Sequence, residues 1–405
     1  MDILLLAYYY PPQNTSGAAR PARFAKYLAE HGCICRVVSA QATEAPQGGF
    51  RNLAAAGAAR LVQRYWPYHE HIEWIPTAVT QARRLIERHN IAAILSTSPP
   101  VSTHVVALWL KRRYGLPWVA DFRDPIEDSP FRGLCYDPAL ERAIFRHADV
   151  CIANTDTLAE VWGKRHSDAA GKVTVIWNGF DPSEKIPPAH PRLRQRKVLA
   201  HIGSIYGGRT PTLVLDSLRR LIRSGRLDPG SVGVELVGDL SDVSLAGYSD
   251  LRENGFVRCA GRYVPRSEAL QFMVDADYLL LLDTNAKGTG MQVPAKLFDY
   301  LRSGQPVLAV TCRNSPTERI LSRSGVSSTC LYPDDPESLL DAKVISFLRF
   351  STTPVIASPW FWNEFDGRVH AQTLARILGR LTADTRSQVS ASPSEPRGRR
   401  CNSVS

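Results

Sequence analysis

A glycine-rich segment, His201–Thr212, contains the residue types that bind a diphosphate. It lies between an apolar strand pattern and a helix pattern, and three glycines precede its arginine. Glycines let backbone amides approach a ligand closely, a helix N-terminus favours anions, and arginine supplies a planar cationic fork. No Gly-Lys-Ser/Thr follows, so the segment is not a Walker loop. We expect phosphate binding by Gly203, Ser204, Gly208 and Arg209; the simpler alternative is an exposed arginine in a flexible loop.

A second glycine-rich segment, residues 288–308, has the same order of strand, loop and helix. Pro294 is expected to start the helix, which places Lys296 in the first turn beside unpaired amides and Asp299 on roughly the same face. A cation suits phosphate, and a carboxylate suits the hydroxyl groups of a sugar. The alternative is a Lys–Asp surface pair worth about 0.2–1 kcal/mol.

The first predicted strand–loop–helix unit contains Ser16, Gly17 and Arg20 near the start of its helix. Gly17 allows a ligand to approach the free amides there. An ordinary turn into a helix explains this segment equally well. The dinucleotide fingerprint GxGxxG is absent here and after every other predicted strand, which argues against an NAD enzyme.

Three charged residues, Asp121, Arg123 and Asp124, cluster at the tip of another predicted strand. Charges at the end of an apolar strand are costly unless they are paired or used in function. Catalysis and a structural Arg–Asp pair that closes the loop are both consistent with this pattern. His104, among Val105, Val106 and Leu108, is expected to be a packed or edge histidine rather than a base.

Apolar runs alternate with helix-period segments along the chain, which predicts an α/β protein with parallel sheets covered by helices. The expected strands are Ile3–Ala7, Cys35–Ser39, Ala93–Ser96, Trp118–Phe122, Val150–Ala153, Thr174–Trp177, Lys197–Ile202, Gly233–Val237, Val257–Cys259, Tyr278–Leu282, Val307–Val310 and Cys330–Tyr332. The expected helices are Ala18–Glu30, Ala78–His89, Ser102–Tyr114, Ala139–His147, Pro211–Ser224, Arg266–Val274, Pro294–Ser303, Ser315–Arg323 and Trp360–Leu381.

These elements form two series, so we predict two Rossmann-like doubly wound domains that face a central cleft. Four prolines in residues 180–191 are incompatible with a helix or a central strand, so this segment marks the connection between the two domains. The expected units are a first domain at 1–183, a linker at 184–195, a second domain at 196–356, a C-terminal helix at 357–382 and a disordered tail at 383–405. Ligands of such folds bind at the carboxyl ends of the strands.

Composition limits the partners and the location of the protein. The net charge of +10 favours an anionic partner, but no long basic face or nucleic-acid-binding module accompanies it, so nucleic acid is the weakest option. No secretory leader and no membrane-spanning run is recognised, and the eight cysteines lack metal-site spacing. We expect a cytoplasmic protein with reduced thiols and no metal. Residues 51–68, which include Arg60, Arg64, Trp66 and Tyr68, suit either an anionic membrane surface or an Ala-rich packed helix.

The ordered motifs resemble the retaining, metal-independent GT-B glycosyltransferases of family 4 over roughly residues 1–380. The resemblance rests on these segments: Tyr-Pro-Pro with Ser-Gly and Arg near the start, Ser-Thr-Ser-Pro-Pro at 96–100, Ala-Asp-Phe-Arg-Asp-Pro at 120–125, Trp-Asn-Gly-Phe-Asp at 177–181, Ile-Gly-Ser-Ile-Tyr-Gly-Gly-Arg at 202–209, Gly261, and Pro-Ala-Lys-Leu-Phe-Asp-Tyr-Leu with Gly-Gln-Pro-Val at 294–307. It depends on the order of the motifs, since each alone is weak.

The resemblance assigns roles to individual residues. Arg209 and Lys296 would hold the donor diphosphate, and Asp299 would bind the nucleotide ribose. The other donor-binding positions would be Gly261, Tyr263 and Val264 at the base, with Met291, Val293 and Pro294. The acceptor would meet Ser16, Gly17, Arg20, Asp121 and Arg123, and catalysis would use Arg123, Asp124, Arg209 and Lys296. Asn178 and Gly179 would mark the end of the first domain, and the last helix would cross back onto it.

Two positions depart from the family pattern. The Glu-x7-Glu motif has Met291 at its first position and Asp299 at its second, and Arg123 stands where many members have histidine. An aspect of donor recognition or catalysis must therefore differ.

The sequence thus predicts an enzyme that moves a sugar from a nucleotide-sugar, as co-substrate without a further cofactor, to a glycan or lipid-linked acceptor. The expected setting is biosynthesis of cell-surface polysaccharide, lipopolysaccharide or glycolipid, with the enzyme cytoplasmic or peripheral on the inner face of the plasma membrane. The alternatives are a sugar-nucleotide epimerase or hydrolase of the same fold and a nucleotide-sugar-binding protein without turnover. An epimerase should offer a carboxylate pair for proton abstraction, which we cannot locate.

Overall fold

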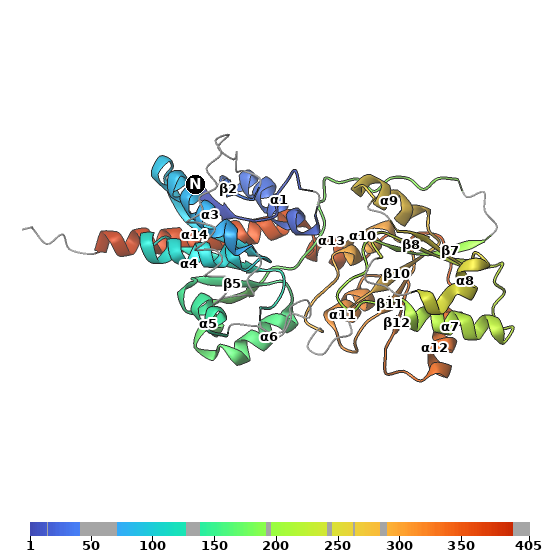
Figure 1. Ribbon diagram of the computed structural model, residues 1–405. Coiled ribbons are helices and arrows are strands. Elements are labelled where there is room, and N and C mark those ends of the chain that lie inside the picture. Colours follow the sequence, from blue (N-terminus) through green and yellow to red (C-terminus); the bar gives the residue numbers. More distant parts are fainter. Residues whose placement is uncertain are drawn as a thin grey trace, which may run out of the picture.

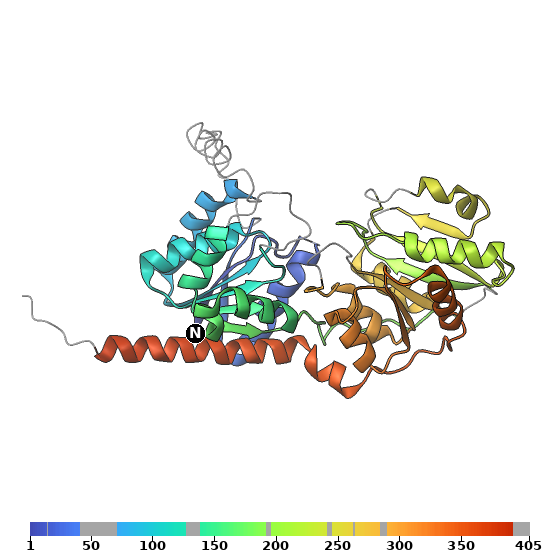
Figure 2. The same cartoon turned by 90° about the horizontal axis from the view of Figure 1, so that it is seen from below.

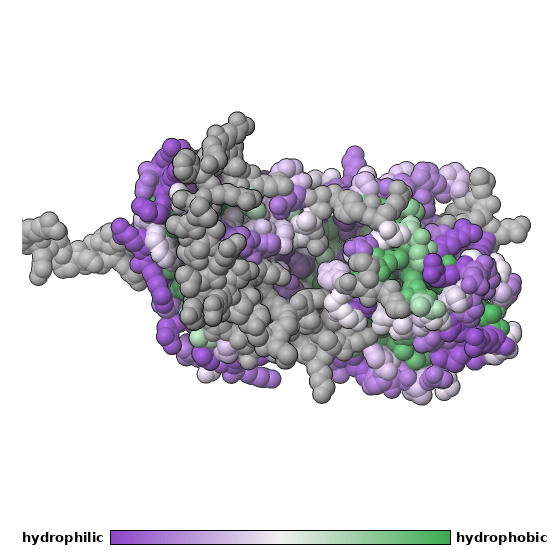
Figure 3. Space-filling view, in the orientation of Figure 1, coloured by the Kyte–Doolittle hydropathy of each residue, from purple (hydrophilic) through white to green (hydrophobic). Residues whose placement is uncertain are grey.

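The computed structural model describes residues 1–13, 15–40, 71–126, 138–191, 196–240, 245–261, 264–283 and 290–391. They form two lobes side by side, each built on a parallel sheet (Figure 1). Seen from this side, hydrophilic residues prevail along the outer rims of both lobes (Figure 3). No helix of the described chain is long and apolar enough to cross a membrane.

The first sheet has six strands in the order β2-β1-β3-β4-β5-β6. The strands are β1 (Asp2–Leu6), β2 (Ile34–Val38), β3 (Ile91–Ser98), β4 (Trp118–Phe122), β5 (Val150–Ala153) and β6 (Val173–Val175). Successive β1 residues point to opposite faces, so Leu4 and Leu6 enter one core while Ile3 and Leu5 enter the other. Both faces are covered by helices, which is why these strands are almost continuously apolar.

Helices of the first lobe cover its sheet from two sides. The core of Leu4 and Leu6 also contains residues of α3 (Ile75–Arg88), α4 (Ser102–Tyr114), α5 (Pro138–His147) and α6 (Asp156–Arg165). The opposite face is covered by α1 (Ser16–Leu28) and by α14 (Gly367–Ala391), the long helix that follows the second lobe. Figure 2 shows α14 running back along the underside of the first lobe. It continues to Ala391, beyond residue 382 where we expected it to end.

The second sheet also has six strands, in the order β12-β11-β10-β7-β8-β9. They are β7 (Lys197–Ile202), β8 (Val232–Val237), β9 (Val257–Ala260), β10 (Tyr278–Leu282), β11 (Val307–Val310) and β12 (Ser328–Leu331). One face packs on α7 (Thr212–Arg223), α8 (Ser249–Glu253) and α12 (Glu337–Phe347). The other packs on α9 (Arg266–Asp275), α10 (Lys296–Ser303), α11 (Pro316–Arg323) and α13 (Pro359–Glu364). The predicted α/β class with two doubly wound parallel sheets is confirmed.

The chain passes between the lobes at two neighbouring places. Phe180 and Asp366 form a parallel bridge, so the outgoing and returning segments lie together. A Cβ on Gly179 would lie 2.1 Å from the carbonyl oxygen of Phe365, and only glycine permits this approach. The single helix expected over Trp360–Leu381 is therefore wrong: it divides into α13 and α14 at this crossing.

Candidate functional site

A cleft of about 430 Å³ lies between loops at the carboxyl ends of strands from both sheets. Its described lining is Tyr9, Thr15, Gly17, Ala19, Arg20, Arg23, Pro99, Arg123, Asp124, Asn178 and Gly179 from the first half of the chain and Tyr206, Arg209, Gln292, Val293, Pro294 and Ala295 from the second. A hollow of similar volume, about 420 Å³, lies at the amino ends of β7, β8 and β10. We place the chemistry in the interlobe cleft, because doubly wound sheets bind ligands at their carboxyl edge.

Arg20, which lines the cleft, forms a buried ion pair with Asp121, which does not line it. Their side chains are 3% and 0% exposed, and Arg20 Nη2 lies 2.7 Å from Asp121 Oδ1. Arg20 also donates to the carbonyl oxygens of Ile176 and Trp177 at 2.8 and 2.6 Å, and Thr97 donates to Asp121 at 2.8 Å. The structural Arg–Asp pair considered from the sequence thus exists, but the partner of Asp121 is Arg20 and not its neighbour Arg123.

Arg123 joins the first turn of α1 to the end of β3 through backbone oxygens. Nη1 donates to Gly17 O at 2.7 Å, Nε donates to Ser98 O at 3.0 Å, and Nη2 donates to Pro99 O. A Cβ on Gly17 would lie 3.1 Å from Arg123 Nη1, so the glycine makes room for the guanidinium. Burial lowers the pKa of Arg123, although Asp124 and Asp121 oppose this shift. The side chain shapes the cleft wall as well as lending it positive charge.

The loop before α10 contacts the first lobe. Gln292 Nε2 donates to Asp124 Oδ1 at 2.8 Å, and Thr155 Oγ1 donates to Met291 O at 2.6 Å. The Met291 side chain, 6% exposed, belongs to the apolar core of the first lobe. A third contact joins Arg319 of α11 to Asp156 at 2.5 Å. Met291, at the first position of the family's Glu motif, therefore makes an interlobe contact.

Two cations lie near each other on the second-lobe side. Arg209 lines the cleft, and Lys296 directly follows the lining residues 293–295 in the chain without being one of them. Gly203 has φ +113°, and a Cβ there would lie 3.0 Å from Lys296 Nζ. Burial and the charge of Arg209 lower the pKa of Lys296 to about 7. No carboxylate pairs with Lys296 in the described part of the chain. The Arg209 guanidinium lies 4.8 Å from the Tyr206 ring centroid. The positive charge of Arg209 disfavours the protonated form of Lys296, and a bound anion would stabilise both cations.

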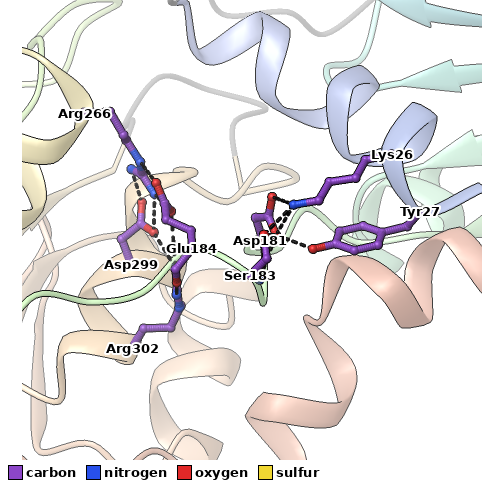
Figure 4. A network of polar contacts seen from close by, with 8 residues as sticks. All are labelled: Lys26, Tyr27, Asp181, Ser183, Glu184, Arg266, Asp299 and Arg302. Carbon is purple, nitrogen blue, oxygen red and sulfur yellow. Dashed lines mark hydrogen bonds and ion pairs between the residues drawn. The ribbon is translucent and has the colours of Figure 1, made fainter.

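Asp299 lies in an ion-pair network that surrounds the linker (Figure 4). Its two oxygens accept from Arg266 at 2.6 and 2.7 Å, and Arg302 lies 3.5 Å away. Arg266 also pairs with Glu184 at 2.7 Å, which connects the linker to α9 and α10. Asp299 is not among the cleft-lining residues, so binding of a ribose by its carboxylate would require an exchange with Arg266.

The segment just before the linker is attached to α1 of the first lobe through Asp181. Its carboxylate accepts from Lys26 Nζ at 2.9 Å and from the Tyr27 hydroxyl. Burial alone would raise the pKa of Asp181, but hydrogen bonds from Tyr27, Lys26 and Ser183 hold it below its ordinary value. Asp181, just before the linker, and Glu184, at its start, therefore fix this part of the chain to different lobes (Figure 4).

The remaining predicted site residues lie around this centre. Ser16 begins α1, while Ser204 and Gly208 belong to the loop after β7. Gly261 follows β9 directly and Val264 precedes α9 by two residues, at the end of the loop that leads to Arg266. Tyr263 lies outside the described residues, as do Arg60, Arg64, Trp66 and Tyr68 of the membrane-contact hypothesis.

Arg23 is a cleft-lining cation that sequence reasoning missed. Burial and Arg20 lower its pKa to about 10. Its position three residues after Arg20 on one helix was the available signal, because residues at that spacing share a face. Gln292 and Tyr206 were also missed; each stands beside a residue that the motifs single out, but nothing in their types indicates a role.

Comparisons with known proteins agree with this architecture. Residues 20–184 match the family model of Glycosyltransferase Family 4. Anabaena HepE in complex with UDP-glucose is similar with 16% identity and a TM-score of 0.55, covering 97% of this chain and 100% of that one. The lipopolysaccharide outer core galactosyltransferase WaaB in its apo form is similar with 12% identity and a TM-score of 0.59, covering 95% and 100%. No curated protein matches the chain in sequence.

These likenesses establish the fold as GT-B, with a glycosyltransferase family match in the first half of the chain. Fold alone does not establish the reaction. A Listeria monocytogenes protein described as a UDP-N-acetylglucosamine 2-epimerase is similar with 11% identity and a TM-score of 0.52, covering 95% of this chain and 97% of that one. The reaction is therefore inferred from the residues of the cleft.

Proposed function

We propose that the protein is a glycosyltransferase that takes its sugar from a nucleoside-diphosphate donor. The observation that carries the proposal is the approach of Arg209 and Lys296 at the carboxyl edge of the second sheet, where Lys296 has no carboxylate partner in the described chain. Two neighbouring cations on the donor side of a GT-B cleft match the charge of a diphosphate.

The same residues suit the chemical step. When the bond between the anomeric carbon and the diphosphate breaks, negative charge develops on the leaving oxygens. Arg209, Lys296 and the free amides at the start of α10 would stabilise that charge without a metal. Asp124 is the carboxylate of the described cleft lining and is the candidate to accept the proton of the acceptor hydroxyl. We propose that the anomeric configuration is retained, as the family resemblance implies.

We further propose that the acceptor is a glycan or a lipid-linked glycan that binds on the first-lobe side. That wall carries Arg20, Arg23 and Arg123, so the cleft is cationic on both sides. Similarity to WaaB, described as a lipopolysaccharide outer core galactosyltransferase, supports biosynthesis of cell-surface polysaccharide or glycolipid. The proposed location is the cytoplasm, with a peripheral contact to the inner face of the plasma membrane.

A donor screen tests the reaction. UDP-, GDP-, ADP- and dTDP-sugars are incubated with the protein, with and without a membrane lipid extract, and nucleotide and sugar products are separated. Release of nucleoside diphosphate that rises with the extract, together with sugar in the lipid fraction, is expected. An epimerised nucleotide-sugar would indicate an epimerase instead, and tight binding without turnover of any donor would indicate a binding protein.

A further inference from the structure

His201 and Lys296 form a partly buried contact next to Gly203. His201 is near the end of β7 and fully buried, and Lys296 is the first residue of α10. Lys296 Nζ lies 3.0 Å from His201 Nε2, and His201 Nδ1 lies 2.9 Å from Leu280 O. The contact therefore connects β7, β10 and the start of α10.

The partners of the imidazole determine its tautomer. A carbonyl oxygen can only accept, so Nδ1 carries the hydrogen that Leu280 O accepts, and Nε2 offers its lone pair. That lone pair accepts a hydrogen bond from the Lys296 ammonium group. Burial and the Lys296 charge hold the pKa of His201 well below its usual value, so the ring stays neutral when Lys296 is protonated.

We propose that His201 is a positioning residue, which holds the Lys296 ammonium group next to Gly203 for the donor diphosphate and so couples donor binding to uptake of one proton by Lys296. This inference rests on the proposed function, since it assigns the diphosphate to Lys296. A lysine has four rotatable side-chain bonds, and a fixed acceptor reduces the entropy lost when a ligand binds.

The charges around Lys296 explain the proton uptake. Lys296 faces Arg209 from the segment after β7 and the neutral His201 from β7. α10 itself also carries Asp299 and Arg302, which are already paired with Arg266 and Glu184. The first lobe adds charges to the cleft wall, namely Arg20, Arg23, Arg123 and Asp124. Burial first and Arg209 second lower the pKa of Lys296 to about 7.

The sign of the pH dependence follows from this arrangement. A diphosphate raises the pKa of Lys296, because it favours the ammonium form. Donor affinity should therefore be constant below about pH 6.5, where Lys296 is already charged, and should fall as the pH rises through about 7. The terminal phosphate of a nucleoside diphosphate, with a pKa of about 6, is fully ionised between about pH 7.5 and 9, so the ligand contributes little to the change there.

Calorimetric titration measures the linked proton directly. UDP, GDP, ADP and dTDP are titrated into the wild-type protein, and the tightest is studied at about pH 8 in two buffers with different ionisation enthalpies. Net uptake approaching one proton is expected. Binding without proton exchange would overturn the coupling, whereas no binding by any of the four nucleotides would overturn the proposed function itself.

Variants separate positioning from a structural role. His201→Leu removes the acceptor, so Lys296 should turn to water; we expect affinity about tenfold lower and independent of pH between about 7.5 and 9. His201→Gln keeps an acceptor oxygen and should restore both affinity and pH profile. His104→Leu, at a fully buried histidine of the first lobe, is the matched control and should alter neither.

The outcomes distinguish the two roles. Wild-type affinity and an unchanged pH profile in His201→Leu would overturn the inference. If His201→Leu does not fold, His201→Asn gives the same comparison, because its polar side chain is too short to reach Lys296; wild-type behaviour in that variant would likewise overturn it.

Discussion

The hydroxyl group of Thr155, at the start of α6, donates a 2.6 Å hydrogen bond to the backbone carbonyl of Met291, in the loop before α10. The first lobe thus binds the loop that precedes Lys296. The Met291 side chain in the first-lobe core and the Gln292–Asp124 hydrogen bond strengthen the contact. Where the family pattern has a glutamate, this chain uses an apolar side chain to hold its lobes together.

Introducing at position 291 the glutamate of the family that the chain resembles should release this loop. We expect Met291→Glu to expel the side chain, because an unpaired carboxylate in apolar surroundings costs several kcal/mol. Hydrogen exchange of amides in residues 290–295 measures the release and should become faster. Met291→Leu is the control. It conserves volume, should cost less than about 1.5 kcal/mol in the free energy of unfolding, and should leave the exchange rates unchanged. Equal protection in the glutamate variant would show that the core contact does not hold the loop.

A charge exchange tests the hydrogen bond between the lobes. Gln292→Glu places a second carboxylate beside Asp124, so like charges should repel and the lobes should separate. In the double variant with Asp124→Asn, the new asparagine can donate a hydrogen bond to the new glutamate, so donor and acceptor have changed places. Small-angle X-ray scattering should give a larger radius of gyration for the single variant and the wild-type radius for the double variant. A single variant with the wild-type radius would contradict the role of this contact.

Removing Asp121 from its ion pair with Arg20 should cause a large loss of stability. Asp121→Ala leaves Arg20 as a buried, uncompensated charge, and we expect a loss of about 3–5 kcal/mol in the free energy of unfolding. Urea unfolding followed by circular dichroism provides the measurement. Lys26→Ala is the matched control, because Lys26 also pairs with an aspartate but is 46% exposed and should cost at most about 1 kcal/mol. Comparable losses in the two variants would mean that burial does not determine the strength of the pair.

Asp181 should make stability depend on acidic pH. Its pKa in the folded protein lies below the ordinary value of 3.8, so its stabilising contribution is present above about pH 4 and is lost as the pH falls through the folded pKa. The thermal midpoint of the wild type should therefore fall more steeply between about pH 5 and 2 than that of Asp181→Asn. Thermal scans across this range provide the comparison, and parallel curves would contradict the assignment.

Much of the fold could be predicted from the sequence because parallel strands buried on both faces leave continuous apolar runs between turns. β10, predicted as Tyr278–Leu282, is one example, and every residue of it is buried. The helices α6, α8 and α12 were missed. The break between α13 and α14 depends on the Phe180–Asp366 bridge, a contact between segments far apart in the sequence that no local pattern shows.

The site was less predictable than the fold. Glycine-rich loops before helices led us to expect a phosphate site at Arg209 and Lys296, because local conformation and charge are visible in the sequence, and this assignment stays a prediction. The partners of the other charged residues depend on tertiary structure: Asp121 meets Arg20, 101 residues away, and Asp299 meets Arg266 of α9. A carboxylate in a motif can thus be read from the sequence, whereas the arginine that pairs with it cannot.

The central claim is that Arg209 and Lys296 bind the diphosphate of a nucleotide-sugar. Titration calorimetry of the tightest-binding donor with Lys296→Ala and Arg209→Ala tests it most directly. Arg323→Ala is the control. The central carbon of its guanidinium group lies 3.9 Å from the Trp360 ring centroid, and Arg323 does not line the cleft. We predict that each of the two variants loses about 1.5–3 kcal/mol of binding free energy and the control none. Donor binding by both variants that equals that of the wild type would contradict the assignment.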